Sequence, residues 1–236
     1  MMAHPILAVI GAGGKTTALR TLARALTGRR VLLTTTTHIQ PIAPPETRAL
    51  LIDPDETALR DALAAPGAVC AGSAAGGKLG ALAPGLFRAA AQTAEVTLCE
   101  ADGAHHRPLK LHRPDEPVVP PGTARCLVVA GLSACGRPVG EAVHRYDRRS
   151  DWAHDPQRPV GAAEVLYCVR EAARASGLPQ DRLHVWLNQA DTAALRAQAA
   201  PVARILSAEG LECRAGSLRS EADGFARWFL SGLAEI

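Results

Sequence analysis

The sequence predicts an α/β fold of three layers, in which a mostly parallel sheet lies between two layers of helices. One observation is that short apolar runs alternate with helical runs along nearly the whole chain. Another is that 47% of the residues are hydrophobic but only 3% are aromatic, so small aliphatic side chains must fill the core. The expected strands are residues 6–10, 31–35, 68–71, 96–99, 125–130, 184–187 and 212–215. The expected helices are residues 15–26, 56–64, 85–93, 162–175, 192–208 and 222–233.

The composition excludes several classes of function. The 236 residues carry 26 lysines and arginines against 23 acids, a balance that does not indicate a nucleic-acid partner. The six cysteines include no C-x-x-C pair, which argues against a zinc site or a redox dithiol. With no apolar run of about 18 residues and no basic leader, a cytoplasmic protein without a membrane partner is expected. We expect a single domain with loop insertions around residues 41–48, 72–85 and 104–121.

A glycine-rich stretch, GAGGKTT, stands directly between the first expected strand and the first expected helix. Glycines let several backbone N–H groups turn toward one anion, and the positive end of the helix adds to that field. Lys15, expected to be exposed at this junction, would reach terminal phosphates, and the Thr16 hydroxyl stands where a Mg²⁺ ligand belongs. The stretch therefore predicts a fold like that of the P-loop NTPases. The expected nucleotide-binding residues are Gly11, Ala12, Gly13, Gly14, Lys15, Thr16 and Thr17.

This loop is shorter than the full G-x-x-x-x-G-K-[ST] pattern, whose first glycine would fall at Val9. It is similar to the abbreviated loop of the Mur-ligase type. The alternative without function is a glycine turn that carries a surface lysine. The strand before the stretch and the helix after it argue against that alternative.

Two carboxylates follow the expected strand at residues 96–99. A nucleoside triphosphatase needs an acid at the end of a strand near its phosphate loop, and "VTLCEADGA" supplies Glu100 and Asp102. Asp102 would hold Mg²⁺ directly or through water, while Glu100 would polarise the attacking water or fix Thr16. Lys15, Glu100 and Asp102 are the expected catalytic residues. The spacing does not decide which acid has which role, and ordinary acids at a strand end remain the alternative.

Two further polar segments are candidates for a second substrate. "TTTTH" closes the expected second strand, so Thr36, Thr37 and His38 would face the phosphates or a substrate. The loop "HHRPLKLHRPDEP" follows Asp102 closely. An anionic substrate would be gripped there by Arg107 and Lys110, with His112 beside them. The alternatives are a threonine-rich strand and a solvated, charged loop.

The segment "VWLNQAD" is similar to the N-K-x-D motif with which GTP-binding proteins read guanine. Asn188 and Asp191 would contact the base, and Asp191 would accept hydrogen bonds from guanine N1 and N2. Gln189 stands where the motif has lysine, whose stem covers the base. GTP is therefore favoured slightly over ATP, and a plain loop after the strand is the alternative.

Together, GAGGKTT, TTTTH, EADG, PLK and DEPVVP resemble the YqeC family, described as selenium-dependent hydroxylase accessory proteins. The resemblance spans nearly the whole chain. It implies a P-loop nucleotide-binding fold and a role in maturing selenium-dependent molybdenum hydroxylases. The implied ligands are Mg²⁺, GTP or ATP, and molybdopterin cytosine dinucleotide as substrate or cargo. The implied partners are the hydroxylase or its maturation factors.

Three functions are open at this point. The first is a Mg²⁺-dependent NTPase that acts on the molybdenum cofactor or on its selenium loading. The second is a phosphotransferase or ligase-like enzyme with a Mur-ligase-type loop. The third is a non-enzymatic carrier whose affinity for its partner is switched by nucleotide. The oligomeric state is not predicted.

Overall fold

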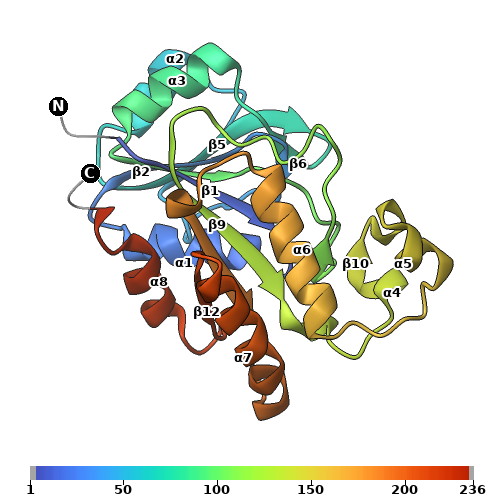
Figure 1. Cartoon of the computed structure of the whole chain (residues 1–236). Helices are drawn as coiled ribbons and strands as arrows, with labels where there is room; N and C mark the ends of the chain where they lie inside the picture. Colours follow the sequence, from blue (N-terminus) through green and yellow to red (C-terminus); the bar gives the residue numbers. More distant parts are fainter. Residues whose placement is uncertain (1–3, 234–236) are drawn as a thin grey trace.

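The computed structural model describes residues 4–233 and has the predicted α/β architecture (Figure 1). Its strands are β1 (Ile6–Gly11), β2 (Arg30–Thr35), β3 (His38–Ile39), β4 (Ala49–Ile52), β5 (Gly67–Ala75), β6 (Lys78–Gly80), β7 (Val96–Glu100), β8 (Leu109–Lys110), β9 (Thr123–Gly131), β10 (Val143–His144), β11 (Leu183–Asn188) and β12 (Glu212–Ala215). Its α-helices are α1 (Lys15–Ala25), α2 (Glu56–Ala62), α3 (Pro84–Thr93), α4 (Val139–Ala142), α5 (Ser150–His154), α6 (Ala162–Ala175), α7 (Ala193–Ala208) and α8 (Ala222–Leu230).

The main sheet is parallel over most of its width. The strand order is β12-β11-β9-β1-β7-β2-β5-β6-β3, with β4 paired to β5. All pairings are parallel except those of β6 with β5 and β3. Strand β1 lies between β7 and β9, so the segments that follow these three strands meet at one edge of the sheet. The mostly parallel sheet and its flanking helices confirm the predicted fold class.

Both faces of the sheet are covered by helices, because successive side chains of each strand point to opposite faces. Leu7 and Val9 pack with α1 and α8 on one face, whereas Ala8 and Ile10 pack with α6 and α7 on the other. Leu32 packs with α2 and α3, which cover the same face as α6 and α7. In residues 4–233, no helix combines the length and apolarity needed to cross a membrane.

The structure contains elements that the sequence pattern did not predict. Strand β4 pairs with β5 at residues just after the proline-rich stretch 41–48. The stretch 72–85 is not only a loop, because β5 continues into it and turns back into β6 at Gly76 and Gly77, both with positive φ. Within residues 104–121, β8 pairs with β10 in a separate two-stranded sheet. Strand β10 belongs to an excursion, residues 132–160, that also holds α4 and α5.

The glycine-rich loop fits against the end of β9 only because both segments lack side chains at the contact. A Cβ added to Gly13 would lie 2.5 Å from Gly131 Cα and 2.7 Å from the Pro108 oxygen, inside contact distance. Gly13 also has φ of 79°, a region that glycine adopts without strain. This close approach fixes the loop against β9.

A pair of substitutions separates the two requirements at Gly13. Gly136 has the same φ of 79°, but a Cβ there would meet nothing within 4 Å. Gly136→Ala should therefore cost only the backbone strain, about 1–2 kcal/mol. Gly13→Ala should cost about 1–3 kcal/mol more, because the methyl group must displace β9 backbone. Urea unfolding of both variants measures the difference, and equal free energies of unfolding would show that the contact does not constrain the loop.

Candidate functional site

The phosphate-loop candidate leaves the carboxyl end of β1 and enters α1 at Lys15. Gly11, Gly13 and Gly14 have φ of 91°, 79° and 139°, conformations that suit glycine alone. Gly14 caps the helix without any side-chain hydrogen bond to its first turn. The N–H groups at this end of α1 are therefore directed toward the space in front of the loop, where an anion would be stabilised.

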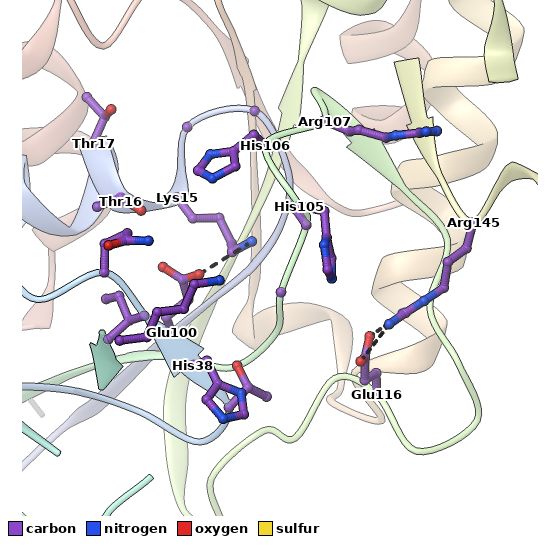
Figure 2. Close-up of a pocket in the computed structure, with 18 of the residues that line it drawn as sticks. Lys15, Thr16, Thr17, His38, Glu100, His105, His106, Arg107, Glu116 and Arg145 are labelled. Carbon is purple, nitrogen blue, oxygen red and sulfur yellow. Dashed lines mark hydrogen bonds and ion pairs between the residues drawn. The ribbon is translucent and has the colours of Figure 1, made fainter. Parts of the chain in front are cut away.

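In front of the loop lies a cavity of about 680 Å³. Figure 2 shows Lys15 and Glu100 on one side of it and Arg145 with Glu116 on the other. The cavity is large enough for a small-molecule ligand. Its lining residues are Gly13, Gly14, Lys15, Thr16, Thr17, Thr37, His38, Ile39, Gln40, Lys78, Glu100, Gly103, Ala104, His105, His106, Arg107, Arg113, Glu116, Arg145 and Gln189.

Lys15 is buried between two carboxylates, so the expectation that it is exposed is wrong. Only 5% of it is exposed. Its Nζ lies 3.1 Å from Asp102 Oδ1 and 3.6 Å from Glu100 Oε1, and it donates to the Gly11 carbonyl at 2.8 Å. Burial would lower the pKa of Lys15, but Asp102 and Glu100 outweigh it and raise that pKa above its ordinary value. Lys15 is thus held as a cation at the mouth of the loop.

The two carboxylates occupy different surroundings, although they are two residues apart. Glu100 lines the cavity, and burial raises its pKa to about 7 against the opposing effect of Lys15. Asp102 is fully enclosed behind the loop. Burial would raise the pKa of Asp102, but Lys15, His112 and Lys110 hold it below its ordinary value. Asp102 is therefore the permanent anion of the pair.

Asp102 is the centre of a buried network. Its Oδ2 accepts from the Gly11 N–H at 2.9 Å and lies 3.1 Å from Lys110 Nζ and 2.8 Å from His112 Nε2. The other ring nitrogen of His112 lies 2.7 Å from Glu171 Oε2 on α6. This chain of polar contacts joins α6 to the first glycine of the phosphate loop. In this arrangement Asp102 positions the loop. Its surroundings differ from those expected of a Mg²⁺ ligand.

The residues expected around a second substrate are divided by the structure. Thr37 and His38 line the cavity, as do Thr16 and Thr17. The Thr36 hydroxyl instead donates to the Val118 carbonyl at 2.6 Å. The threonine segment thereby ties the end of β2 to the loop that follows β8.

The basic residues of the loop after β7 are engaged in contacts within the protein. Arg107 borders the cavity, but its Nη1 donates to the carbonyls of Gly140 and Val143 at 2.7 Å each, and Figure 2 shows it pointing away from Lys15. Lys110 and His112 are buried around Asp102 and do not border the large cavity. The sequence signal for charge was correct, but spacing alone did not separate buried charges from those at the cavity.

Several residues at the cavity were not singled out from the sequence. Glu116 and Arg145 form an ion pair in the cavity wall, and Lys78 of the β5–β6 hairpin also lines the cavity. The adjacent His105 and His106 were visible as a polar pair, and both have left-handed backbones, with φ of 47° and 60°. Arg145 gave no local signal, because it lies in the excursion after β9 that no periodicity announced.

The segment expected to read the base lies beside the glycine-rich loop. Asn188 is buried at the end of β11, where its Nδ2 donates to the Gly13 carbonyl at 2.8 Å and its Oδ1 accepts from the Leu218 N–H at 3.1 Å. Gln189 lines the cavity and accepts a hydrogen bond from the Ser133 hydroxyl at 2.6 Å. Asp191 is exposed just beyond the strand. Asn188 therefore joins the loop to the segment after β12, while Asp191 is free to contact a ligand outside the cavity.

Comparison with known proteins gives one family match and two similar proteins. The family model described as YqeC protein matches residues 7–147. The chain is 34% identical over 191 residues to the uncharacterized protein YqeC of Escherichia coli (strain K12), covering 77% of this chain and 74% of that protein. The crystal structure of HypB from Helicobacter pylori in complex with nickel matches 98% of this chain and 87% of its own, with 13% identity and a TM-score of 0.44. The family resemblance expected from the motifs is confirmed.

The raised pKa of Glu100 gives the ligand-free protein a specific pH dependence. Its folded pKa of about 7 lies above the ordinary value of 4.5, so between these values the folded protein keeps a proton that the unfolded chain has lost. The contribution of this carboxyl to stability should therefore be present below about pH 4.5 and be lost as the pH rises to about 7. Glu100→Gln should remove that slope. Unfolding free energies measured between these pH values test it, with the exposed Glu56→Gln as control.

A Glu100→Gln protein that loses stability with pH as steeply as the wild type would contradict this assignment. If Glu56→Gln flattened the pH dependence of stability, that dependence would belong to surface carboxylates.

Proposed function

Because the chain belongs to the YqeC family, we propose that it binds a Mg²⁺–nucleoside triphosphate at the GAGGKTT loop and acts as an accessory protein in enzyme maturation. One observation carries the proposal: Lys15 and the capless N-terminus of α1 face a cavity that the carboxylate of Glu100 also borders. A cation, several N–H donors and an acid at the end of the neighbouring strand are the groups that a triphosphate and its metal require.

In this proposal the residues of the loop divide the work. The N–H groups of Gly13 and Gly14 and the ammonium of Lys15 bind the phosphates, while Asp102 holds Gly11 and Lys15 in place from behind. Thr16 and Glu100 would hold Mg²⁺, because both residues line the cavity and the buried Oε2 of Glu100 has no hydrogen-bond partner in residues 4–233. A carboxylate oxygen without a donor suits a hard cation. When bound, the ion would neutralise charge on the terminal phosphates.

The more specific part of the proposal, the enzyme that is matured, rests on the family resemblance. We propose that nucleotide hydrolysis supports the maturation of selenium-dependent molybdenum hydroxylases, with molybdopterin cytosine dinucleotide as substrate or cargo. Product analysis separates this from the rival functions: inorganic phosphate indicates hydrolysis, and a phosphorylated acceptor indicates a phosphotransferase. Turnover that stays absent with cofactor and partner present would indicate a nucleotide-switched carrier.

Replacement of Lys15 tests the nucleotide site. Mg²⁺–nucleotide at about 100 times its dissociation constant should stabilise the wild-type protein by about 2.7 kcal/mol. Lys15→Met should lose that stabilisation. Since Lys15 also neutralises two buried carboxylates, the ligand-free stability of each variant is measured first and the shift is taken relative to it. Arg24→Met, an exposed change in the last turn of α1, is the matched control.

A full nucleotide shift in folded Lys15→Met would remove Lys15 from the site. Loss of the shift in Arg24→Met as well would show that the assay reports a general property of the protein.

The base preference gives a separate prediction. If Asp191 contacts the base, GTP should bind roughly tenfold more tightly than ATP, because adenine N1 would leave an acceptor facing the carboxylate. Asp191→Asn should weaken GTP and favour xanthosine triphosphate, whose C2 carbonyl suits an amide donor. Calorimetric titration with the three nucleotides measures this. Equal affinity of the wild type for GTP and ATP would make the NQAD segment an ordinary loop.

A further inference from the structure

We propose that the part of the cavity around Arg145 and Glu116, opposite Lys15, is a second anion site, which binds a small phosphate ester in the same cavity as the nucleotide. Arg113, Arg145 and Lys78 are its cationic groups. The proposal rests on the nucleotide site proposed above, whose loop borders the same cavity. It differs from the expectation drawn from sequence, in which Arg107 and Lys110 gripped the second substrate.

The cavity carries more positive charge than a nucleotide site alone accounts for. Its lining has five lysine and arginine side chains but only two glutamates, with three histidines in addition. Lys15 is neutralised by Asp102 and Glu100, and Arg107 is bound to backbone carbonyls. Of the remaining cations, Figure 2 shows Arg145 on the side of the cavity opposite Lys15, and Arg113 lies 3.2 Å from Glu116 on that side.

Glu116 binds two of these cations, Arg145 and Arg113. Arg145 binds it through both terminal nitrogens, at 2.5 and 3.0 Å, while Lys110 and Arg113 lie 3.1 and 3.2 Å from it. One carboxylate thus faces three cations. Lys78 also lines the cavity and has no carboxylate partner in residues 4–233. Lys110 also pairs with Asp102, and Arg113 lies 3.2 Å from Asp115. Arg113, Arg145 and Lys78 therefore exceed Glu116 and Asp115 by one positive charge, which an incoming anion would offset.

The wall that carries Arg145 is fixed before any ligand binds. Strand β10 ends at His144, pairs with β8, and is held by the two hydrogen bonds from Arg107 to Gly140 and Val143. The ring of His144 stacks on that of His105 at 4.6 Å. Arg145 itself has a left-handed backbone, with φ of 60°, which turns its side chain back toward Glu116. The guanidinium is therefore preorganised at the cavity.

The chemistry of the cluster favours a phosphate. Guanidinium groups bind phosphate oxygens through planar N–H donors, and Arg113 and Arg145 each have five N–H groups, more than their carboxylate contacts use. His105 and His106 add ring nitrogens at the same cavity. An acidic peptide is a less suitable ligand, since the charges line one concave space between the β5–β6 hairpin and the excursion 132–160.

Binding of ribose 5-phosphate to the full chain tests the second site. The protein is first saturated with Mg²⁺ and a non-hydrolysable triphosphate analogue, so that the position of the terminal phosphate is filled. Ribose 5-phosphate is then titrated calorimetrically, with ribose and tetraglutamate in parallel. The wild type should bind ribose 5-phosphate only. Arg113→Gln/Arg145→Gln should bind it at least tenfold more weakly, with the affinity for the analogue unchanged within about twofold, and Arg24→Gln should behave as the wild type.

Different outcomes overturn different statements. No binding of ribose 5-phosphate by the wild type, equal binding by the double variant, or a preference for tetraglutamate would overturn the second site. Equal loss of analogue and ribose 5-phosphate would assign these arginines to the nucleotide. The ribose 5-phosphate titration is also repeated without the analogue. If the analogue does not bind, the nucleotide site is contradicted, and the titration without analogue still tests the second site. If the double variant is unfolded, Arg145→Lys, which keeps the charge and loses the planar N–H donors, should still weaken binding.

Discussion

The buried ion pair between Lys15 and Asp102 is the interaction on which the rest of the site depends. Charges so fully enclosed are stable only when they are paired and hydrogen-bonded. Asp102 meets this condition through the Gly11 N–H, Lys110 and His112 as well as Lys15. Removing any partner would leave charge unpaired in the protein interior. The network therefore fixes the first glycine, the lysine and the loop after β7 as one unit.

Parallel strands explain how distant segments reach this unit. The carboxyl ends of β1, β7 and β2 lie side by side, which brings the glycine loop, Glu100 and the threonine segment to one edge. Strand β11 adds Asn188, whose amide reaches the Gly13 carbonyl from the other side. Segments separated by more than 170 residues thus converge because the sheet aligns their strands. The close contact of Gly13 with Gly131 then requires that neither position carries a side chain.

Much of this was predictable from the sequence, for physical reasons that also mark the limits. Strands buried on both faces consist of continuous apolar runs, so the ends of the seven expected strands lie within four residues of those observed. The loop between β1 and α1 was predictable because glycines followed by a lysine, directly between a strand and a helix, are typical of an anion-binding turn. The burial of His112 was not predictable, since this residue pairs with Glu171, about 60 residues away on α6. Arg145 was missed because short elements stabilised by tertiary contacts leave no periodic pattern.

The two acids of "EAD" show how one local sequence supports two different tasks. Asp102 faces three basic groups and stays ionised, so it is suited to holding the loop in one geometry. Glu100 shares only Lys15 as a close cation and faces the cavity, so its charge depends on what the cavity contains. A bound cation would favour its ionised form, and an empty cavity favours the neutral form near pH 7. The surroundings of the two acids therefore push their pKa values apart, one up and one down. Spacing in the sequence could not distinguish Glu100 from Asp102, whereas their surroundings in the fold do.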